Sequence, residues 1–263
     1  MAAPALSPSG ARVLVTGAAG GIGRAIVQAL ADCRCAVAAC DVSEEVSEVP
    51  GASVTARFDV RDRTACQTSV RRAIEELGGC DAVVAGAGVV DTIHRAERFP
   101  EDAWRMDLES NLSGHFHVSQ AAFEALTASG EGRIVMISSA AAELGLPGQV
   151  AYGAAKAGIV GLARTLAAEW GPRGIRCNVV MPGFIATPKV RSLPGPLLDG
   201  LTRSVPLGRV GTTEELAGVV AFLLSPAAAY INGAVIRGDG GFGLSMGGLA
   251  GAQAGEPAGG TGR

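Results

Sequence analysis

The chain has 263 residues, of which 48% are hydrophobic and 18% charged, and its formal net charge is −3. A slightly acidic chain lacks the positive charge that marks nucleic-acid-binding proteins. No apolar run reaches the ~20 residues that a membrane-spanning helix needs, and Met1 to Gly10 lack the basic start and long apolar core of a secretion signal. We therefore expect a cytoplasmic protein that binds neither nucleic acid nor membrane.

The six cysteines are scattered along the chain without a Cys-x-x-Cys pair. Several of them lie inside apolar runs, as in Cys35 to Cys40. Reduced thiols in a hydrophobic core explain this pattern better than disulfides or metal ligands do. We expect no metal site.

The first predicted elements are a strand, a glycine-rich turn and a helix. Residues 12–16 form a short apolar run, residues 17–23 read Gly-Ala-Ala-Gly-Gly-Ile-Gly, and residues 24–30 have helical periodicity. Glycines let the backbone turn tightly and approach a pyrophosphate, and a helix N-terminus offers that group free N–H donors. The pattern predicts a dinucleotide-binding turn whose contacts are Gly17, Gly20, Gly21, Ile22 and Gly23.

An acidic residue, Asp41, ends the second predicted strand, about 20 positions after the glycines. A carboxylate at that place can bind ribose hydroxyls and would repel a 2′-phosphate. Residues 42–45 contain no Arg or Lys to compensate, and Arg24 is the one basic residue nearby. The sequence therefore predicts a preference for NAD over NADP; the alternative is a turn residue that only ends a strand.

Strands and helices alternate along the rest of the chain. Further strands are predicted at residues 53–58, 81–85, 133–138, 175–181 and 234–236, and helices at 64–77, 101–128, 152–170 and 212–224. Residues 188–209, punctuated by Pro and Gly, form an excursion long enough for a lid. The alternation predicts an α/β fold: a single doubly wound Rossmann-type domain with a parallel seven-stranded sheet, over residues 11–245. We expect a flexible leader at residues 1–10 and a disordered Gly/Ala-rich tail at 246–263.

Tyr152 and Lys156 stand four residues apart at the start of a predicted helix and so share one of its faces. Ser139 follows a predicted buried strand, whose carboxyl end meets the crevice above the sheet. A Lys cation lowers the pKa of a neighbouring Tyr phenol from its usual value near ~10, which favours proton exchange with a carbonyl or hydroxyl oxygen. Asn111 lies inside a predicted helix, where Asn is unfavourable unless its side chain has a function.

Together these motifs resemble those of the short-chain dehydrogenase/reductase family, over roughly residues 10–245. The matching segments are Thr16-Gly-x-x-x-Gly-Ile-Gly23, Asp59-Val60, Asn178 to Gly183, Val205 to Arg209 and Gly238 to Gly241. Asn111, Ser139, Tyr152 and Lys156 match the catalytic tetrad in order and spacing. One segment departs from the family pattern, because Ala85-Gly86-Ala87-Gly88 stands where the family usually has Asn-Asn-Ala-Gly.

The resemblance implies an NAD(P)-dependent oxidoreductase that transfers a hydride between nicotinamide and a secondary alcohol or ketone. Tyr152 would act as general acid/base, Ser139 would polarise the substrate oxygen, Lys156 would lower the Tyr152 pKa and hold the nicotinamide ribose, and Asn111 would position a water. Beyond the glycine-rich turn, the implied cofactor contacts are Asp41, Asp59, Val60, Gly86, Ala87, Gly88, Tyr152, Lys156, Pro182, Gly183, Ile185 and Thr187. The family also points to a homotetramer, built through the predicted helices at about 102–128 and 152–170.

Two other functions stay open: a 3-oxoacyl-[acyl-carrier-protein] reductase that uses NADPH, and a dinucleotide-binding regulator without turnover. The complete tetrad argues against the regulator. Carrier proteins are acidic, and residues 127–132 offer no base to attract one. The apolar residues of the excursion at 188–209 favour a free, mostly apolar alcohol or ketone as substrate.

Overall fold

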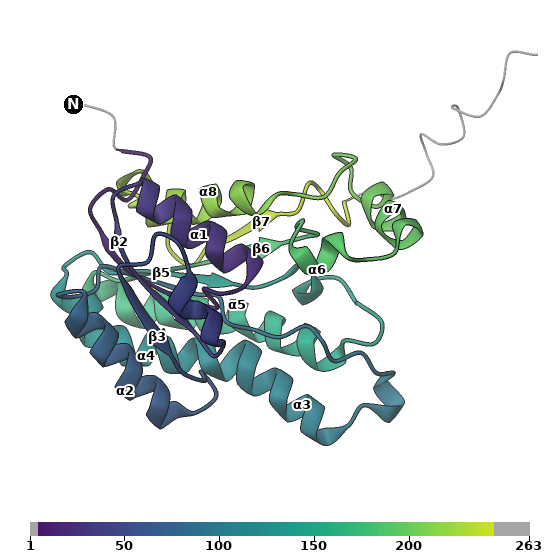
Figure 1. The fold of residues 1–263 in the computed structure, drawn as a ribbon, viewed down its shortest axis with the longest axis horizontal. Helices are drawn as coiled ribbons and strands as arrows, with labels where there is room; N and C mark the ends of the chain where they lie inside the picture. The colour runs from purple at the N-terminus through teal and green to yellow at the C-terminus, as the bar shows by residue number, and fades with distance from the viewer. Residues whose placement is uncertain (1–4, 245–263) are drawn as a thin grey trace, which may run out of the picture.

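A parallel sheet of seven strands runs through the centre of the molecule, in the order β3-β2-β1-β4-β5-β6-β7 (Figure 1). The strands are β1 (Arg12–Thr16), β2 (Ala36–Asp41), β3 (Val54–Arg57), β4 (Ala82–Ala85), β5 (Arg133–Ile137), β6 (Arg176–Pro182) and β7 (Val235–Gly238). This computed structural model describes residues 5–244, so the tail predicted at 246–263 lies outside the described residues. The predicted fold class and its seven parallel strands are confirmed.

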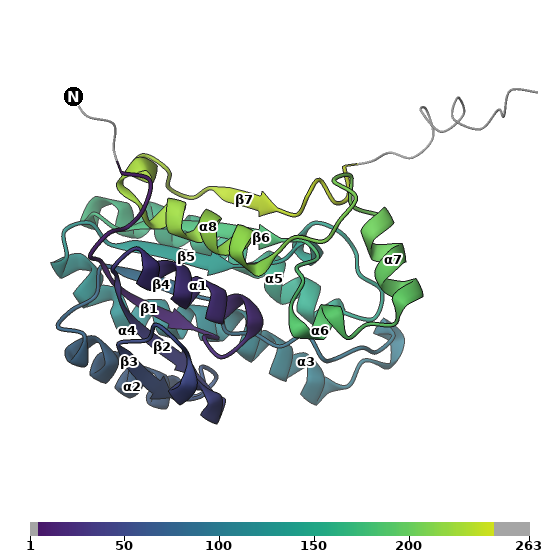
Figure 2. The ribbon, with the colours of Figure 1, turned by 45° about the horizontal axis from the view of Figure 1, so that its top comes forward.

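Helices cover both faces of the sheet (Figure 2). On one face α1 (Gly21–Asp32) packs against α8 (Thr213–Leu224), and the other face is covered by α2 (Arg63–Glu76), α4 (Gly114–Ala128) and α5 (Val150–Trp170). Side chains alternate along each strand, so Val13 and Val15 join the first core and Leu14 the second. Because both faces are buried, the strands read as continuous apolar runs.

The strand order reverses between β1 and β4, which lie side by side and are each followed by a loop at the same edge of the sheet. Ligands of open α/β sheets bind outside the carboxyl ends of the strands at such a point. The fold therefore places the glycine-rich turn after β1 and the segment 86–88 after β4 beside one crevice.

The helix predicted at 101–128 is interrupted by a wider turn. It consists of α3 (Glu101–Leu108), a π-helical segment η3 (Glu109–Ser113) and α4. In the wide turn the Gly114 N–H donates to the Glu109 carbonyl, five residues back. The excursion at 188–209 also contains short helices, α6 (Pro188–Arg191) and α7 (Gly195–Arg203).

Residues 5–10, predicted as part of a flexible leader, lie against the folded domain. Ala227 N donates to Ala5 O at 3.2 Å, and the Cys35 thiol donates to Pro8 O at 2.7 Å. All six cysteines are free thiols, and five of them are buried. Within residues 5–244, no helix combines the length and apolar character needed to cross a membrane, and no cluster of His, Cys, Asp and Glu is arranged to hold a metal ion.

Candidate active site

The glycine-rich turn and the segment after β4 form one cradle of backbone. Gly17 has a φ of 73°, and a Cβ there would lie 2.7 Å from the Gly86 carbonyl oxygen. A Cβ at Gly23 would overlap with the Gly17 carbonyl. The Thr16 hydroxyl accepts hydrogen bonds from Gly86 N at 3.2 Å and Ala87 N at 3.3 Å. Side chains are thus excluded where a flat ligand needs close backbone approach.

A cavity of ≈ 690 Å³ opens along this cradle. At one end it is bordered by residues that follow β2 and β3, and at the other by the loop after β4 and the start of α6. Its lining includes the predicted cofactor contacts Gly17, Gly20, Gly21, Ile22, Gly23, Asp41, Asp59, Val60, Gly86, Ala87, Gly88 and Thr187. The N-terminus of α1 at a glycine cradle, with an acid one strand away, fits a pyrophosphate and its ribose.

Asp41 lies in the lining of the cavity and is held by backbone donors. Its Oδ2 accepts from Ala19 N at 2.9 Å, and its Oδ1 accepts from Ser43 N at 3.0 Å. Arg24 pairs with Glu45 at 3.0 Å and donates to Ala19 O at 2.8 Å. Two further arginines lie near, and they pair with Glu44 and Asp59: Arg57 and Arg61. The Asp41 carboxylate is therefore fixed in place, and Arg24 already has an acidic partner.

Asp59 and Val60 border the same end of the cavity after β3. Asp59 accepts from Arg61 Nε at 2.9 Å, and this hydrogen bond lowers the pKa of Asp59 below its usual value. The Val60 carbonyl lies 2.9 Å from His117 Nδ1, and the Val60 side chain packs where a Cβ at Gly114 would be. Gly114 thus lets the helix that carries Asn111 approach the cavity.

Asn111 lies in the π-helical segment and is completely buried. Its Oδ1 accepts from Val89 N at 3.1 Å, and its Nδ2 donates to Val89 O at 3.0 Å. A Cβ at Gly88 would overlap with Asn111 Oδ1 and would lie 3.3 Å from Lys156 Nζ. The loop after β4 is therefore clamped against both Asn111 and Lys156, and π-helical turns of this kind are frequent at functional sites.

Lys156 is only 4% exposed, so its ammonium is shielded from water. Nζ donates to Ile137 O at 3.0 Å and lies 5.7 Å from the centroid of the Tyr152 ring. The Ser138 hydroxyl donates to Lys156 O at 2.7 Å and so links α5 to the residue that follows β5. Burial lowers the pKa of Lys156 from 10.5 to about 7, so the group can gain or lose a proton near neutral pH.

Tyr152 is half-buried beside Lys156, and the direction of its pKa shift differs from the expectation. Burial raises the pKa of Tyr152, the Ser139 hydroxyl lowers it, and the charge of Asp107 raises it again. The net shift is therefore upward, opposite to the expected lowering by Lys156, and burial is its largest cause. Ser139 itself accepts from Ala141 N at 3.2 Å and is the second residue after β5.

Five predicted cofactor residues lie outside the lining of this cavity: Tyr152, Lys156, Pro182, Gly183 and Ile185. Pro182 ends β6, and Gly183 N donates to Gly238 O at 3.2 Å. The Ile185 side chain is 5% exposed and packs in the core with α1 and α8, so only its backbone could face a ligand. The structure thus brings the early segments and the tetrad together, and places the segment 182–185 at the sheet edge beside them.

The start of α6 reaches over the glycine-rich turn. A Cβ at Gly21 would lie 3.0 Å from the Pro188 ring, and Thr187 Oγ1 caps α6 by accepting from Val190 N at 3.3 Å. Lys189 forms an ion pair with Asp91, on the loop after β4. This contact joins two distant segments that both line the cavity, and nothing in the sequence pattern indicates it.

Two more buried groups near the tetrad were missed by sequence reasoning. Asp107 is 1% exposed, accepts from the Thr92 hydroxyl at 3.3 Å, and has a pKa raised by burial. His115 is 1% exposed, and burial together with the Lys156 charge lowers its pKa, which keeps the ring neutral. A polar residue on the apolar face of a predicted helix was the available signal for both.

The family model and the similar proteins of known sequence are both reductases or dehydrogenases. The profile of the enoyl-(acyl carrier protein) reductase family matches residues 17–243. The chain is 40% identical to a (3R)-3-hydroxyacyl-CoA dehydrogenase of Canis lupus familiaris, over 92% of this chain and 99% of that one. It is 38% identical to the 3-oxoacyl-[acyl-carrier-protein] reductase of Escherichia coli (strain K12), over 87% of this chain and 95% of that one.

Solved structures agree with these relatives. A putative short-chain alcohol dehydrogenase from Sinorhizobium meliloti 1021 superimposes with a TM-score of 0.85 at 35% identity, over 92% of this chain and 100% of that one. A putative NAD(P)-dependent gluconate 5-dehydrogenase from Beutenbergia cavernae, with bound NADP, superimposes with a TM-score of 0.85 at 32% identity, over 91% and 99% of the two chains. The cradle, the crevice and these likenesses agree: the chain belongs to the short-chain dehydrogenase/reductase family and is an NAD(P)-dependent oxidoreductase acting on hydroxyl and keto groups.

Proposed function

We propose that the protein interconverts a secondary alcohol and its ketone with Tyr152 as the general acid/base, and that it prefers NAD to NADP. The assignment of residues is supported by the contacts among Ser139, Tyr152 and Lys156. It is also supported by the packing of Asn111 and Lys156 against Gly88, which lines the cavity.

The bound nicotinamide supplies the hydride in reduction and accepts it in oxidation. In reduction the Tyr152 phenol, which burial keeps protonated, donates its proton to the substrate oxygen. The Ser139 hydroxyl hydrogen-bonds the same oxygen and stabilises the charge that develops on it. Lys156, with a pKa of about 7, returns a proton to Tyr152, while Asn111 holds the loop that closes over Lys156.

The proposed test of activity is a turnover screen of secondary alcohols and ketones with NAD(H) and NADP(H) in parallel. Cofactor-dependent turnover of at least one substrate class is expected, and it should vanish in a Tyr152→Phe preparation of equal purity. Tight cofactor binding without turnover of any alcohol or ketone would instead favour the non-catalytic regulator.

The preference for NAD rests on Asp41 and the engaged Arg24. Repulsion between the Asp41 carboxylate and a 2′-phosphate should give at least about tenfold higher kcat/KM with NADH than with NADPH, equivalent to ~1.4 kcal/mol. Asp41→Asn removes the charge but keeps one amide oxygen as acceptor, and should bring the two cofactors to within a few-fold. Glu48→Gln, an exposed acid on the neighbouring segment, is the matched control. Equal or better efficiency of the unmodified enzyme with NADPH would refute the preference.

A free, mostly apolar substrate is supported by exposed apolar side chains on segments at this edge of the sheet. Ile93 is 67% exposed, Val150 41% and Leu197 50%. The curated relatives include a cis-4-hydroxycyclohexanecarboxylate dehydrogenase of Sinomonas cyclohexanicum, 36% identical over 87% of this chain and 95% of that one. Ketones of cyclic and aliphatic compounds are therefore the first candidates.

The substrate proposal is tested against the acyl-carrier alternative with one acyl group on two supports. Catalytic efficiency is compared for free ketones, a 3-oxoacyl-coenzyme A and the same acyl group on acyl-carrier protein. We expect free ketones to be used best and the carrier protein to add nothing over coenzyme A. A tenfold or greater advantage of the carrier-bound substrate would overturn the idea.

We also infer a homotetramer in the cytoplasm. Small residues, Ala154, Ala157, Gly161 and Ala168, form an exposed stripe along α5, and Phe116 on α4 is 36% exposed. Reduced thiols fit a reducing compartment. Light scattering at micromolar concentration should give a tetramer. Gly161→Arg, whose Cβ position is open within one subunit, should dissociate it. A monomeric mass of the unmodified protein would contradict the proposal.

A further inference from the structure

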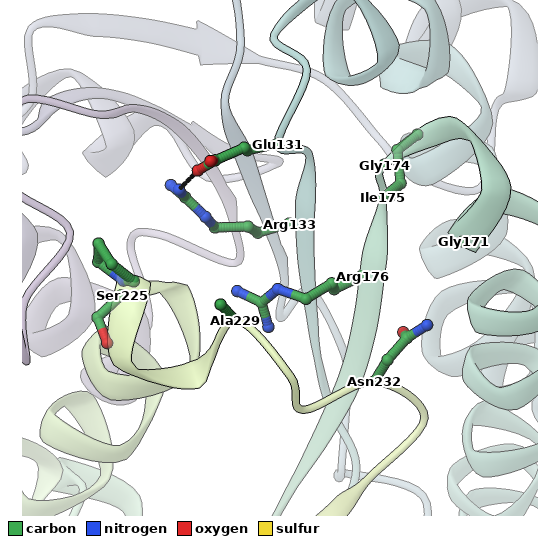
Figure 3. Close-up of a pocket in the computed structure, with 10 residues that line it drawn as sticks. Glu131, Arg133, Gly171, Gly174, Ile175, Arg176, Ser225, Ala229 and Asn232 are labelled. Carbon is green, nitrogen blue, oxygen red and sulfur yellow. Dashed lines mark hydrogen bonds and ion pairs between the residues drawn. The ribbon is translucent and has the colours of Figure 1, made fainter. Parts of the chain in front are cut away.

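A second cavity, of ≈ 300 Å³, lies at the amino-terminal edge of the sheet (Figure 3). It is formed where β5 and β6 begin, together with the turn at 171–174, the segment after α8 and Asn232. Because the strands are parallel, this edge is opposite to the one that carries Tyr152 and the glycine-rich cradle. The proposed dehydrogenase chemistry leaves this cavity without a role.

Two arginines line this cavity side by side. Arg133 and Arg176 are the first residues of neighbouring strands and stand opposite one another in the register. Figure 3 shows the two side chains running in the same direction across the cavity, with the Arg133 guanidinium at Glu131 and the Arg176 guanidinium near Ala229. Like charges directly opposite on adjacent strands are unfavourable, and a guanidinium stays protonated in proteins. The arrangement therefore concentrates positive charge in a partly enclosed space.

Among residues 5–244, Glu131 alone forms an ion pair with one of these two arginines, although Asp81 also lies close enough to sense the Arg133 charge. Glu131 Oε2 lies 2.8 Å from Arg133 Nη2, and the Glu131 side chain is 80% exposed while that of Arg133 is 12% exposed. Arg176 donates to the carbonyls of Ile231 at 3.0 Å and Leu223 at 3.1 Å. Among residues 5–244 no acidic side chain forms an ion pair with Arg176. The charge of Arg133 accordingly adds to burial in lowering the pKa of Arg176.

We propose that this cavity binds a small phosphate-bearing anion, a phosphate dianion or a phosphomonoester, between Arg133 and Arg176. A dianion balances two guanidinium groups, and the planar donor fork of Arg matches phosphate oxygens. In the ligand-free protein Glu131 occupies part of the site as an internal competitor. Because its side chain is mostly in water and holds a single partner, it can rotate away when the anion enters.

The test is calorimetric titration of inorganic phosphate and of glycerol 3-phosphate into the full-length protein saturated with NAD. Saturation blocks the glycine-rich turn, which also attracts phosphate. Arg133→Gln should weaken binding at least about tenfold, since a charge-assisted hydrogen bond is lost. Glu131→Gln should tighten binding about three- to tenfold, because the competitor loses its charge. Arg72→Gln and Glu76→Gln, from an exposed ion pair on α2, are the matched controls and should change nothing.

The opposite signs of the two variants make the proposal easy to overturn. The proposal fails if saturation with NAD abolishes phosphate binding. It also fails if Glu131→Gln does not increase the affinity for phosphate. Should Arg133→Gln not fold, Glu131→Gln decides the matter, because Glu131 is exposed and supports no core contact. Tighter binding of glycerol 3-phosphate would identify a phosphomonoester as the ligand, and equal or tighter binding of inorganic phosphate would identify the free ion.

Discussion

The two edges of the sheet hold cations in different chemical forms. At the carboxyl edge, burial brings the pKa of Lys156 to about 7, so this cation can lose its proton. At the amino edge, Arg133 and Arg176 share a cavity and stay charged. A lysine stands where a proton must move and arginines stand where a charge must persist. The length of the strands therefore separates the residue that can exchange a proton, Lys156, from the two arginines that keep their charge.

The largest expected effect comes from removing the proton donor at the carboxyl edge. Tyr152→Phe should lower kcat by about 10²–10⁴-fold, the usual contribution of general acid/base catalysis. Cofactor affinity should change little, because the cradle and Asp41 are untouched. Steady-state turnover and titration of cofactor binding measure the two quantities. A variant that turns over at nearly the original rate would remove Tyr152 from the mechanism.

Stability against pH sharpens the contrast between the two kinds of cation. The folded-state pKa of Lys156, about 7, is below its usual 10.5. Below about pH 7 the folded protein must hold a buried ammonium, and as pH rises from about 7 to 10.5 the unfolded state binds more protons. The free energy of unfolding therefore increases as the pH rises from about 7 to 10.5, because Lys156 loses its proton in the folded protein first.

Lys156→Met should accordingly be more stable than the unmodified protein by about 1–4 kcal/mol near pH 6, a range taken from replacing buried charges with apolar groups. The difference should shrink toward pH 10.5. Urea unfolding without cofactor at several pH values measures it. A less stable Met variant near pH 6 would show that the bond from Nζ to Ile137 O outweighs the desolvation of the charge.

Crowding the carboxyl edge tests how closely its parts are packed. In Gly88→Ala the new methyl group overlaps with Asn111 Oδ1 and approaches Lys156 Nζ. Overpacking of this kind costs about 1–3 kcal/mol, so both kcat and the denaturant midpoint should fall. Gly218→Ala is the control, because its Cβ meets nothing within 4 Å on an exposed helix position. Equal behaviour of the two variants would mean that the loop after β4 is free to move.

The smallest expected effect concerns the Lys189–Asp91 ion pair, which joins two segments that line the cavity. Its side chains are 54% and 75% exposed, and an exposed pair contributes about 0.2–1 kcal/mol. Lys189→Met and Asp91→Asn should each weaken cofactor binding by at most about fivefold, and the double variant should be no worse than either single one. Cofactor fluorescence titrations measure this, and additive losses would show that the residues act separately.

Local patterns predicted the fold and the residues that sit on regular elements. Asp41 ends β2 and Tyr152 and Lys156 share a face of α5 because period and turn chemistry alone decide those places. The roles assigned to the tetrad stay predictions. The contacts that the sequence does not reveal depend on segments far apart in the chain: Lys189 meets Asp91 at a separation of 98 residues, and Arg133 meets Arg176 through strand register.

The direction of the Tyr152 pKa shift could not be predicted from the sequence either. Spacing indicates that Lys156 is near the phenol, but the effect of a cation depends on how much water both groups lose. Here Ile137 O and Ser138 enclose Lys156 and burial dominates. The same reasoning applies to Asn111, whose π-helical turn is stabilised by Val89 and by the approach of Gly114 to Val60, not by its own neighbours in sequence.

The π-helical turn η3 separates α3 from α4, and the two helices bury faces that point in different directions. Each residue advances an α-helix by roughly 100°, so one extra residue in a turn rotates everything after it by about that angle. Before the turn α3 faces α5, and after it α4 faces α2. The one extra residue in the turn therefore lets the two helices pack against different neighbours. Deletion of one residue between 109 and 113 would turn the face that buries Val118 and Ala122 toward water.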